Sequence, residues 1–146
     1  MDLKQVRIYS GLPSATRDPR TYSAYRRQEA HWKKQGVEVV SRPLRYPYNW
    51  PKLPAEQKGV DVSLAVDFVV LAIEGTFDVG VFASTDTDLR PAIEFVAGRR
   101  GLPVEVCSWR TASFRKGLPV PGIRIWCHRL AKSDYDQVAD DTDYNS

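Results

Sequence analysis

Three aspartates, Asp61, Asp86 and Asp88, are the residues of this chain whose type and spacing best suit chemistry. Asp86 and Asp88 directly follow an apolar run at residues 79–83 that predicts a buried strand ending at Ser84. In an open α/β sheet the carboxyl ends of the strands face the ligand crevice, so this strand would deliver both carboxylates there. Carboxylates gathered together repel one another unless a cation lies among them, and hard oxygen ligands select Mg²⁺ or Mn²⁺. The sequence therefore predicts a divalent-metal site.

The elements expected to position these aspartates alternate between strand and helix. Apolar runs and turn residues predict strands at residues 6–9, 37–40, 79–84, 103–109 and 123–128, and helices at residues 18–35, 61–73 and 91–100. The stretch Ser10-Gly11-Leu12-Pro13-Ser14 is expected to break the first strand. Asp61 is expected to act as the N-cap of the helix at residues 61–73. This alternation is typical of an α/β fold with a mainly parallel sheet covered on both faces.

The helix at residues 61–73 is unusually apolar. We expect one stripe of it to face the core, and apolar residues on its other sides favour burial nearly all round. The expected stripe consists of Val62, Ala65, Val66, Val69 and Ile73. Asp67 is six residues beyond Asp61, well around the helix, and is expected to bond structurally instead of joining the metal site.

Basic residues recur on one side of the helix at residues 18–35. Arg20, Arg27 and Lys34 are spaced every seven residues, with Arg26 and Lys33 beside them, so one face carries a double basic row. Such a row suits a phosphate backbone. A solvated outer face is the simpler explanation of the same row, and both interpretations stay open.

The loop at residues 42–51 combines arginines with aromatic side chains. Arg42 and Arg45 stand among Tyr46, Tyr48 and Trp50, the combination that a site stacking unpaired bases would use. Proline-rich loops also carry aromatic residues only to pack them over the edge of a core, and that alternative stays open.

Composition and charge predict one globular domain with an acidic tail. The 146 residues are 42% hydrophobic and 27% charged, which suits a single domain at residues 1–131. Five aspartates crowd the last thirteen residues without a basic partner, so residues 132–146 are expected to form a disordered tail. The rest of the chain keeps 21 basic against 13 acidic residues. A basic body suits a polyanion partner, for whose surface the tail could compete, although a tail that only aids solubility is an equal alternative.

The remaining composition indicates a cytoplasmic protein. No apolar run reaches membrane-spanning length, and the N-terminus lacks a charged start followed by an apolar core. Cys107 and Cys127 fall in predicted strands without partners at zinc-finger spacing, so we interpret them as small buried residues in a reducing compartment, with a disulfide less favoured. His31 and His128 are isolated and are expected to be surface or packing residues.

Three motifs together resemble a known family. They are Lys58-Gly59-Val60-Asp61, Leu64-Ala65-Val66-Asp67, and Ser84-Thr85-Asp86-Thr87-Asp88-Leu89 with Pro91. Their combination and spacing are similar to those of the NYN domain family of PIN-like nucleases, in its LabA/DUF88 branch. The resemblance covers most of the chain, from the strand at Val6 to about Trp109.

The resemblance implies a three-layer α/β/α PIN-like fold and a metal-dependent ribonuclease. It implies that the catalytic, metal-binding residues are Asp61, Asp86 and Asp88, that Ser84 helps to shape the site, and that Lys58 lies near the phosphate, while Arg42 and Arg45 are candidates for binding the RNA. Mg²⁺ or Mn²⁺ held by carboxylates can activate a water molecule and stabilise the charge that develops on a phosphodiester. No side chain would need to act as nucleophile.

One departure from the family pattern concerns the N-terminus. Members of the family usually begin with a central strand that ends in an Ile-Asp-x-x-Asn type motif, and nothing before Val6 supplies it. Asp2 would lie at the amino end of the strand at Val6, away from the crevice. The recorded start lies downstream of the true one, or the chain is a shortened form, or a partner provides the strand. We therefore expect rearranged strand pairing or a homodimer, and weakened metal affinity.

Two other classes of function compete with a nuclease. A catalytically degenerate module would keep the fold and the basic surface and bind RNA or a protein partner. A phosphatase or nucleotide-sugar transferase would use Asp86 and Asp88 as its Asp-x-Asp motif. That reading fits poorly, because a dehalogenase-type phosphatase places this motif near the N-terminus with a following Thr, whereas Leu89 follows here.

Overall fold

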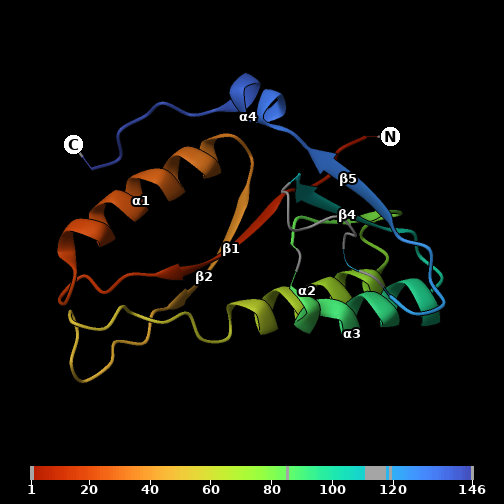
Figure 1. Ribbon diagram of the computed structural model, residues 1–146, viewed down its shortest axis with the longest axis horizontal. Coiled ribbons are helices and arrows are strands. Elements are labelled where there is room, and N and C mark those ends of the chain that lie inside the picture. Colours follow the sequence, from red (N-terminus) through yellow and green to blue (C-terminus); the bar gives the residue numbers. More distant parts are fainter. Residues whose placement is uncertain (1, 85, 111–117, 119, 146) are drawn as a thin grey trace. The chain divides into compact units, whose positions relative to one another are not determined.

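The fold is mixed α/β with parallel strands, as the sequence predicts. A computed structural model describes residues 2–84, 86–110, 118 and 120–145. The chain forms two compact units, one of Met1–Leu64 with Asp141–Ser146 and one of Ala65–Asp140. Strands and helices alternate along the first unit, whereas in the second the described elements include two successive strands, β4 (Val104–Trp109) and β5 (Trp126–Leu130) (Figure 1).

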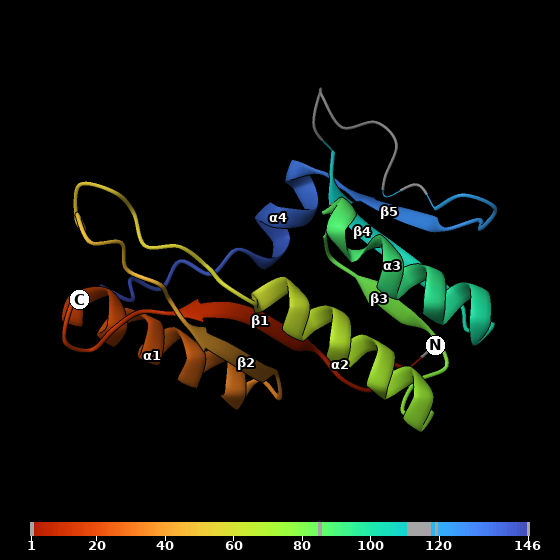
Figure 2. The ribbon, with the colours of Figure 1, turned by 90° about the horizontal axis from the view of Figure 1, so that it is seen from below.

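The first unit is a strand–helix–strand arrangement. Strand β1 (Arg7–Leu12) leads into helix α1 (Pro19–Lys34) and then strand β2 (Glu38–Pro43), which pairs with β1 in parallel. Helix α1 starts where predicted, because the side chain of Asp18 accepts a hydrogen bond from the amide of Thr21 at 3.2 Å and Pro19 occupies the first turn. Figures 1 and 2 show α1 lying along this strand pair.

Both strands of this unit are longer than the sequence indicates. The break predicted at residues 10–14 begins too early, because β1 continues through Ser10 and Gly11 to Leu12, which pairs with Pro43 at the end of β2; the strand then ends before Pro13. The reason is close packing over Gly11. A Cβ atom there would collide with the side chain of Leu44 and lie 3.1 Å from Cγ of Gln57. The glycine in this strand therefore serves a close approach of side chains and does not mark a turn.

Helix α2 (Val60–Glu74) begins one residue earlier than predicted. Asp61 therefore lies inside the first turn of the helix and is not its N-cap, which corrects the sequence interpretation. Gly59, with a φ of 74°, makes the turn into the helix. The first turn still favours the charge of Asp61, because its carboxylate lies near the positive end of the helix dipole.

The second unit contains a three-stranded parallel sheet. Its strands lie in the order β3 (Gly80–Phe82), β4 (Val104–Trp109) and β5 (Trp126–Leu130), as Figure 2 shows. Between β3 and β4 the chain forms a 3-10 turn, η1 (Thr87–Leu89), helix α3 (Arg90–Ile93) and a π-helical stretch, η2 (Glu94–Arg99). Together these confirm the helix predicted at 91–100. Strand β5 begins three residues later than predicted, because Ile123 pairs with Val120 across the turn at Gly122, and the pairing with β4 begins only at Trp126.

The core of this unit lies between the helical segment and the sheet. Its largest fully buried side chains are Leu89, Ile93, Val96 and Val106. The first three follow the i, i+4, i+7 spacing of one helical face. From α2, Phe68 packs in a stacked arrangement on Phe77 and edge-on against Phe82, with ring centroids 5.4 and 4.3 Å apart.

The predicted core stripe of α2 is wrong at three of its five positions. Val62, Val66 and Ile73 are exposed, and Ala65 and Val69 are half-buried. Ala72, outside the predicted stripe, is buried. Helical periodicity identifies an apolar face, but on a helix that is apolar nearly all round it cannot decide which face the neighbouring elements cover.

The acidic segment at residues 132–146 begins with a short helix, α4 (Lys132–Val138). Ala131 is the N-cap of this helix, and its amide donates a hydrogen bond to the Asp134 carboxylate at 2.6 Å. Most of the chain between β4 and Pro121 falls outside the described residues. Among the helices that the structure describes, none combines the length and the apolar character needed to cross a membrane.

Candidate functional site

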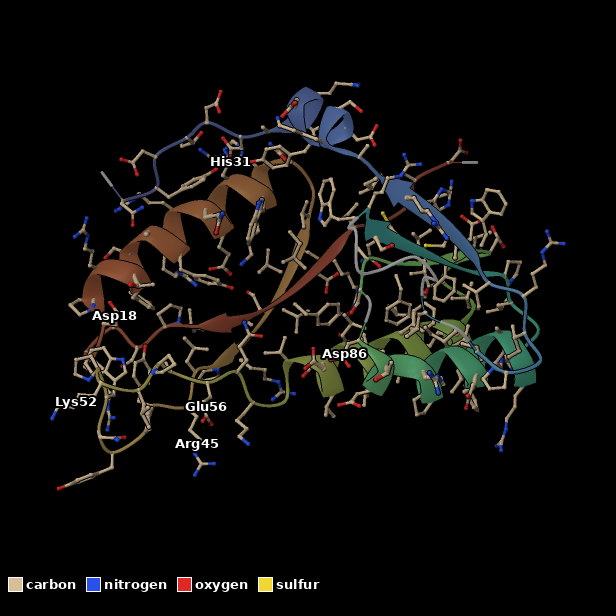
Figure 3. All side chains as sticks on the ribbon, in the orientation of Figure 1. Asp18, His31, Arg45, Lys52, Glu56 and Asp86 are labelled. Carbon is tan, nitrogen blue, oxygen red and sulfur yellow. The ribbon has the colours of Figure 1, made fainter. Side chains whose placement is uncertain are left out.

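Asp86 and Asp88 lie together in the segment that follows β3. The amide of Asp86 donates to Oγ of Ser84 at 3.1 Å, and Oδ1 of Asp86 accepts a hydrogen bond from the amide of Asp88 at 2.9 Å. Asp86, labelled in Figure 3, thereby caps η1. Both aspartates are exposed. Leu89, fully buried directly after them, anchors the turn in the core. The structure thus brings Ser84, Asp86 and Asp88 into one local group at the carboxyl end of β3.

The donor set of this group suits a hard divalent cation. Mg²⁺ keeps several of its waters and is commonly held by one or two carboxylates, so Asp86 and Asp88 fit that role. Asp61 belongs to the other unit, and its membership of the same group stays a prediction. Over the described residues, no group of three or more Asp, Glu, His or Cys side chains is arranged to hold a metal ion.

Arg42 connects the end of β2 to the start of α2. Its Nε donates to Oγ of Ser63 at 2.8 Å, and the same hydroxyl donates to the carbonyl of Gly59 at 2.8 Å. These bonds fix the turn that carries Lys58 and Asp61, both of which are exposed. Arg42, predicted to bind RNA, therefore has at least a structural function in positioning this turn.

Arg45 closes the aromatic loop at its base. Its amide and carbonyl pair with those of Glu56 in an antiparallel bridge, with both N···O distances at 2.9 Å (Figure 3). Inside the loop, Trp50 meets the ring of Tyr46 edge-on with centroids 5.3 Å apart. Tyr48 is fully exposed. The loop therefore packs two of its aromatic residues and presents the third to solvent, so each of the two interpretations of the sequence describes part of it.

A pocket of about 380 Å³ lies at the carboxyl ends of β1 and β2. Its lining consists of Leu12, Pro13, Ser14, Arg17, Pro43, Leu44 and Tyr46. The amide of Ser14 donates to the hydroxyl of Tyr46 at 2.9 Å, and the guanidinium of Arg17 lies 5.6 Å from the centre of the Tyr46 ring. Apolar walls with an arginine and an aromatic ring suit a planar, negatively charged ligand such as a nucleotide.

Sequence reasoning missed Arg17 as a member of this pocket. Arg17 lies in the turn before α1, and nothing in its local pattern separates it from the other basic residues. Only the return of the chain through Tyr46, after β2, places an aromatic ring beside it.

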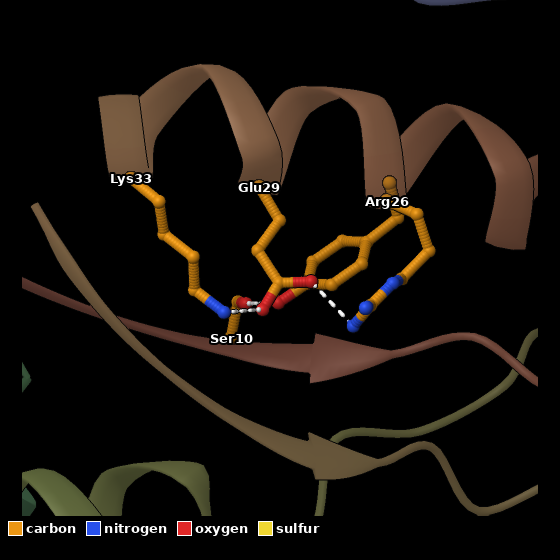
Figure 4. Close-up of polar contacts among 5 residues, drawn as sticks. Ser10, Arg26, Glu29 and Lys33 are labelled. Carbon is orange, nitrogen blue, oxygen red and sulfur yellow. Dashed lines mark hydrogen bonds and ion pairs between the residues drawn. The ribbon is translucent and has the colours of Figure 1, made fainter. Parts of the chain in front are cut away.

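Glu29 pairs with two of the five cations in the double basic row of α1. It is buried, and its carboxylate accepts hydrogen bonds from Arg26 Nη1 and Lys33 Nζ, each at 2.7 Å (Figure 4). Arg26 and Lys33 therefore neutralise a buried charge. The row that remains, which we call the outer row, consists of Arg20, Arg27 and Lys34, spaced seven residues apart and all exposed. Sequence reasoning also missed Glu29, whose signal is an acid three residues from Arg26 and four from Lys33.

The two cysteines lie on neighbouring strands, β4 and β5, and both are free thiols. Burial, and secondarily the neighbouring Cys127, raise the pKa of Cys107. Desolvation disfavours the charged thiolate, which explains the direction. Cys107 thus stays protonated at neutral pH, which suits a packing residue better than a nucleophile.

One comparison with known proteins gives a match. The family model of the NYN domain matches residues 3–118, about four fifths of the chain, and this range includes Asp61, Asp86 and Asp88. A search of curated proteins and a search of solved structures each gave no significant match.

Proposed function

This chain belongs to the NYN domain family, within the PIN-like nuclease superfamily, and on that premise we propose that it is a metal-dependent ribonuclease. The observation that carries the proposal is the local pair of exposed carboxylates, Asp86 and Asp88, held by a hydrogen bond at the carboxyl end of β3. Nucleases of this superfamily usually use divalent metal ions, and this pair is the part of the chain best suited to hold one.

In this proposal Asp86 and Asp88 hold Mg²⁺ or Mn²⁺, with Asp61 as the third acidic residue. When bound, such an ion lowers the pKa of a water molecule and stabilises charge on the phosphodiester. Ser84 positions Asp86 through the bond from the Asp86 amide. The capping bond of Asp86 keeps one of its oxygens oriented, so the carboxylate needs little rearrangement when it takes up the cation.

RNA would be bound by basic and aromatic residues of the first unit. Lys58 and Arg45 are exposed and supply charge for phosphate groups, while the pocket beside Arg17 and Tyr46 has the size and lining for an unpaired base. A substitution of Arg17 by Gln is expected to weaken single-stranded RNA binding about threefold to tenfold and to reduce its salt dependence.

The test is cleavage of a labelled single-stranded RNA with Mn²⁺ or Mg²⁺, beside EDTA. Asp86→Asn is the informative variant, because Asn caps a helix as well as Asp does and the fold of the turn is retained. Asp78→Asn is the matched control, since Asp78 is exposed and precedes the amino end of β3. We expect Asp86→Asn to lose cleavage at least a hundredfold and Asp78→Asn to keep it. Equal cleavage by both variants, or cleavage that persists in EDTA, would refute the proposal.

A second candidate is a catalytically degenerate module that binds RNA or a protein partner. The observation favouring it is that the described residues contain no group of three or more potential metal ligands. For such a module, RNA binding would survive both EDTA and Asp86→Asn, and neither the original protein nor the variant would cleave.

A further inference from the structure

The end of the chain lies along the outer side of α1. Residues 141–145 belong to the first unit and follow the helix in both ribbon views (Figures 1 and 2). The carbonyl oxygen of Tyr144 accepts two hydrogen bonds from Arg27, from Nε at 3.0 Å and from Nη2 at 2.6 Å. The ring of Tyr144 meets that of His31 edge-on, with centroids 6.0 Å apart. Tyr144 is half-buried, whereas its neighbours in this segment are exposed.

The contact with Arg27 uses the donors that an arginine offers to phosphate. Nε and one terminal nitrogen point in parallel from the same edge of the guanidinium, and this edge binds carboxylate or phosphate oxygens in pairs. A single carbonyl oxygen occupies both donors here. A carbonyl oxygen carries less negative charge than a phosphate oxygen, so a phosphate can displace the Tyr144 carbonyl from the two donors of Arg27.

The segment as a whole offers α1 the same kinds of groups that a nucleotide would offer. It brings an acceptor oxygen to Arg27, an aromatic ring to His31, and the negative charges of Asp141 and Asp143 to a helix whose outer row is basic. Because Arg26 and Lys33 pair with Glu29, the outer row of Arg20, Arg27 and Lys34 is the part of α1 that remains to meet an anion. Residues seven apart on a helix are about 10 Å apart, which lets one extended strand contact successive members of the row.

We propose that the outer face of α1 binds the phosphate backbone of single-stranded RNA, and that residues 141–145 cover this face and compete with the RNA. The choice of RNA rests on the proposed function; the covering contact does not. The segment lowers the apparent affinity by the fraction of molecules in which the face is open. If that fraction is about one in five, release of the segment tightens RNA binding about fivefold.

The experiment measures the dissociation constant of a labelled single-stranded RNA by fluorescence anisotropy, in EDTA so that no cleavage occurs. Four test proteins are compared, together with two control variants. The test proteins are the original chain, Tyr144→Ala, a chain ending after Asp140, and that truncated chain with Arg27→Gln added. Asn145→Ala is the control for Tyr144→Ala, because it changes an exposed neighbour in the same segment. Arg100→Gln is the control for loss of one exposed arginine elsewhere.

We expect Tyr144→Ala and the truncated chain to bind RNA about fivefold more tightly, with a steeper salt dependence, and Asn145→Ala to bind as the original chain does. Adding Arg27→Gln to the truncated chain should remove most of the gain, and Arg100→Gln should not. Unchanged or weaker binding after truncation would overturn the inference, and so would a gain that Arg27→Gln leaves intact. The metal-dependent cleavage test is independent of these variants, so the nuclease proposal can stand when this inference fails.

Discussion

The buried carboxylate of Glu29 allows a prediction whose size follows from the structure. Only 5% of its side chain is exposed, and each oxygen accepts one bond of 2.7 Å, Oε1 from Lys33 and Oε2 from Arg26. Glu29→Gln keeps the volume of the side chain but replaces one oxygen by an amide group that can only donate. Because glutamine carries no charge, both ion pairs are lost: one cation keeps a hydrogen bond to the amide oxygen, and the other faces the amide NH2 donor.

The magnitude depends on how exposed the two cations are. A hydrogen bond to a charged group contributes about 1.5–3 kcal/mol when it is shielded from water. Arg26 and Lys33 are about half exposed, with 52% and 53% of their side chains accessible, so each pair is screened and contributes nearer 1 kcal/mol. We expect Glu29→Gln to lower the free energy of unfolding by about 2 kcal/mol, which corresponds to about 6 °C in Tm.

Urea unfolding followed by circular dichroism at pH 7 measures this difference. Glu94→Gln is the control, because Glu94 is an exposed acid at the start of η2 and its change is expected to stay within about 0.5 kcal/mol. The reasoning fails if Glu29→Gln is no less stable than Glu94→Gln. In that case the cost of taking the carboxylate out of water cancels its two ion pairs, as happens in some buried salt bridges.

Three further predictions concern packing, a thiol and the pocket. Gly80→Ala should cost about 2 kcal/mol in urea unfolding, because its Cβ would collide with Cε2 of Phe68 and lie 2.6 Å from Cζ of the same ring. Gly98→Ala, with its nearest neighbour at 3.4 Å, should change stability little. Cys107 should react with iodoacetamide more slowly at pH 8 in the folded protein than in urea, because its raised pKa leaves less thiolate, and the folded rate should climb as pH rises further; equal rates would contradict this. Tyr46→Phe should lose about 1 kcal/mol in the same unfolding assay, since its hydroxyl accepts a backbone amide at 2.9 Å, and an unchanged midpoint would contradict that.

The parts of the fold that the sequence predicts well are those set by local chemistry. The start of α1 follows from Asp18 and Pro19, whose capping and fixed φ act within one turn. Strand boundaries are predicted less well, since the ends of β1 and β5 depend on the partner strand. Gly11 shows the reason: a side chain there would collide with Leu44 and crowd Gln57, and both residues lie more than thirty positions away in the sequence.

The candidate functional residues likewise fall into those that local sequence predicts and those that it does not. The bond between Asp86 and Asp88 spans two residues, so an Asp-x-Asp after an apolar strand suffices to predict the pair. The pocket beside Arg17 requires β1 and β2 to pair in a particular register and bring Tyr46 back to the turn before α1. No local pattern contains that information.

The basic row of α1 shows why counting charges overstates a binding surface. Five cations recur on one side of the helix, yet a single buried acid, Glu29, engages Arg26 and Lys33 at the same time. A cation that neutralises a buried carboxylate can bind a phosphate and release its counterions only by leaving that carboxylate unpaired, which is costly. The surface that can respond to RNA is therefore the outer row, and there Arg27 already bonds to Tyr144. The net charge of this helix thus sets an upper limit on its attraction for RNA, while the partners of each cation decide how much of that attraction is available.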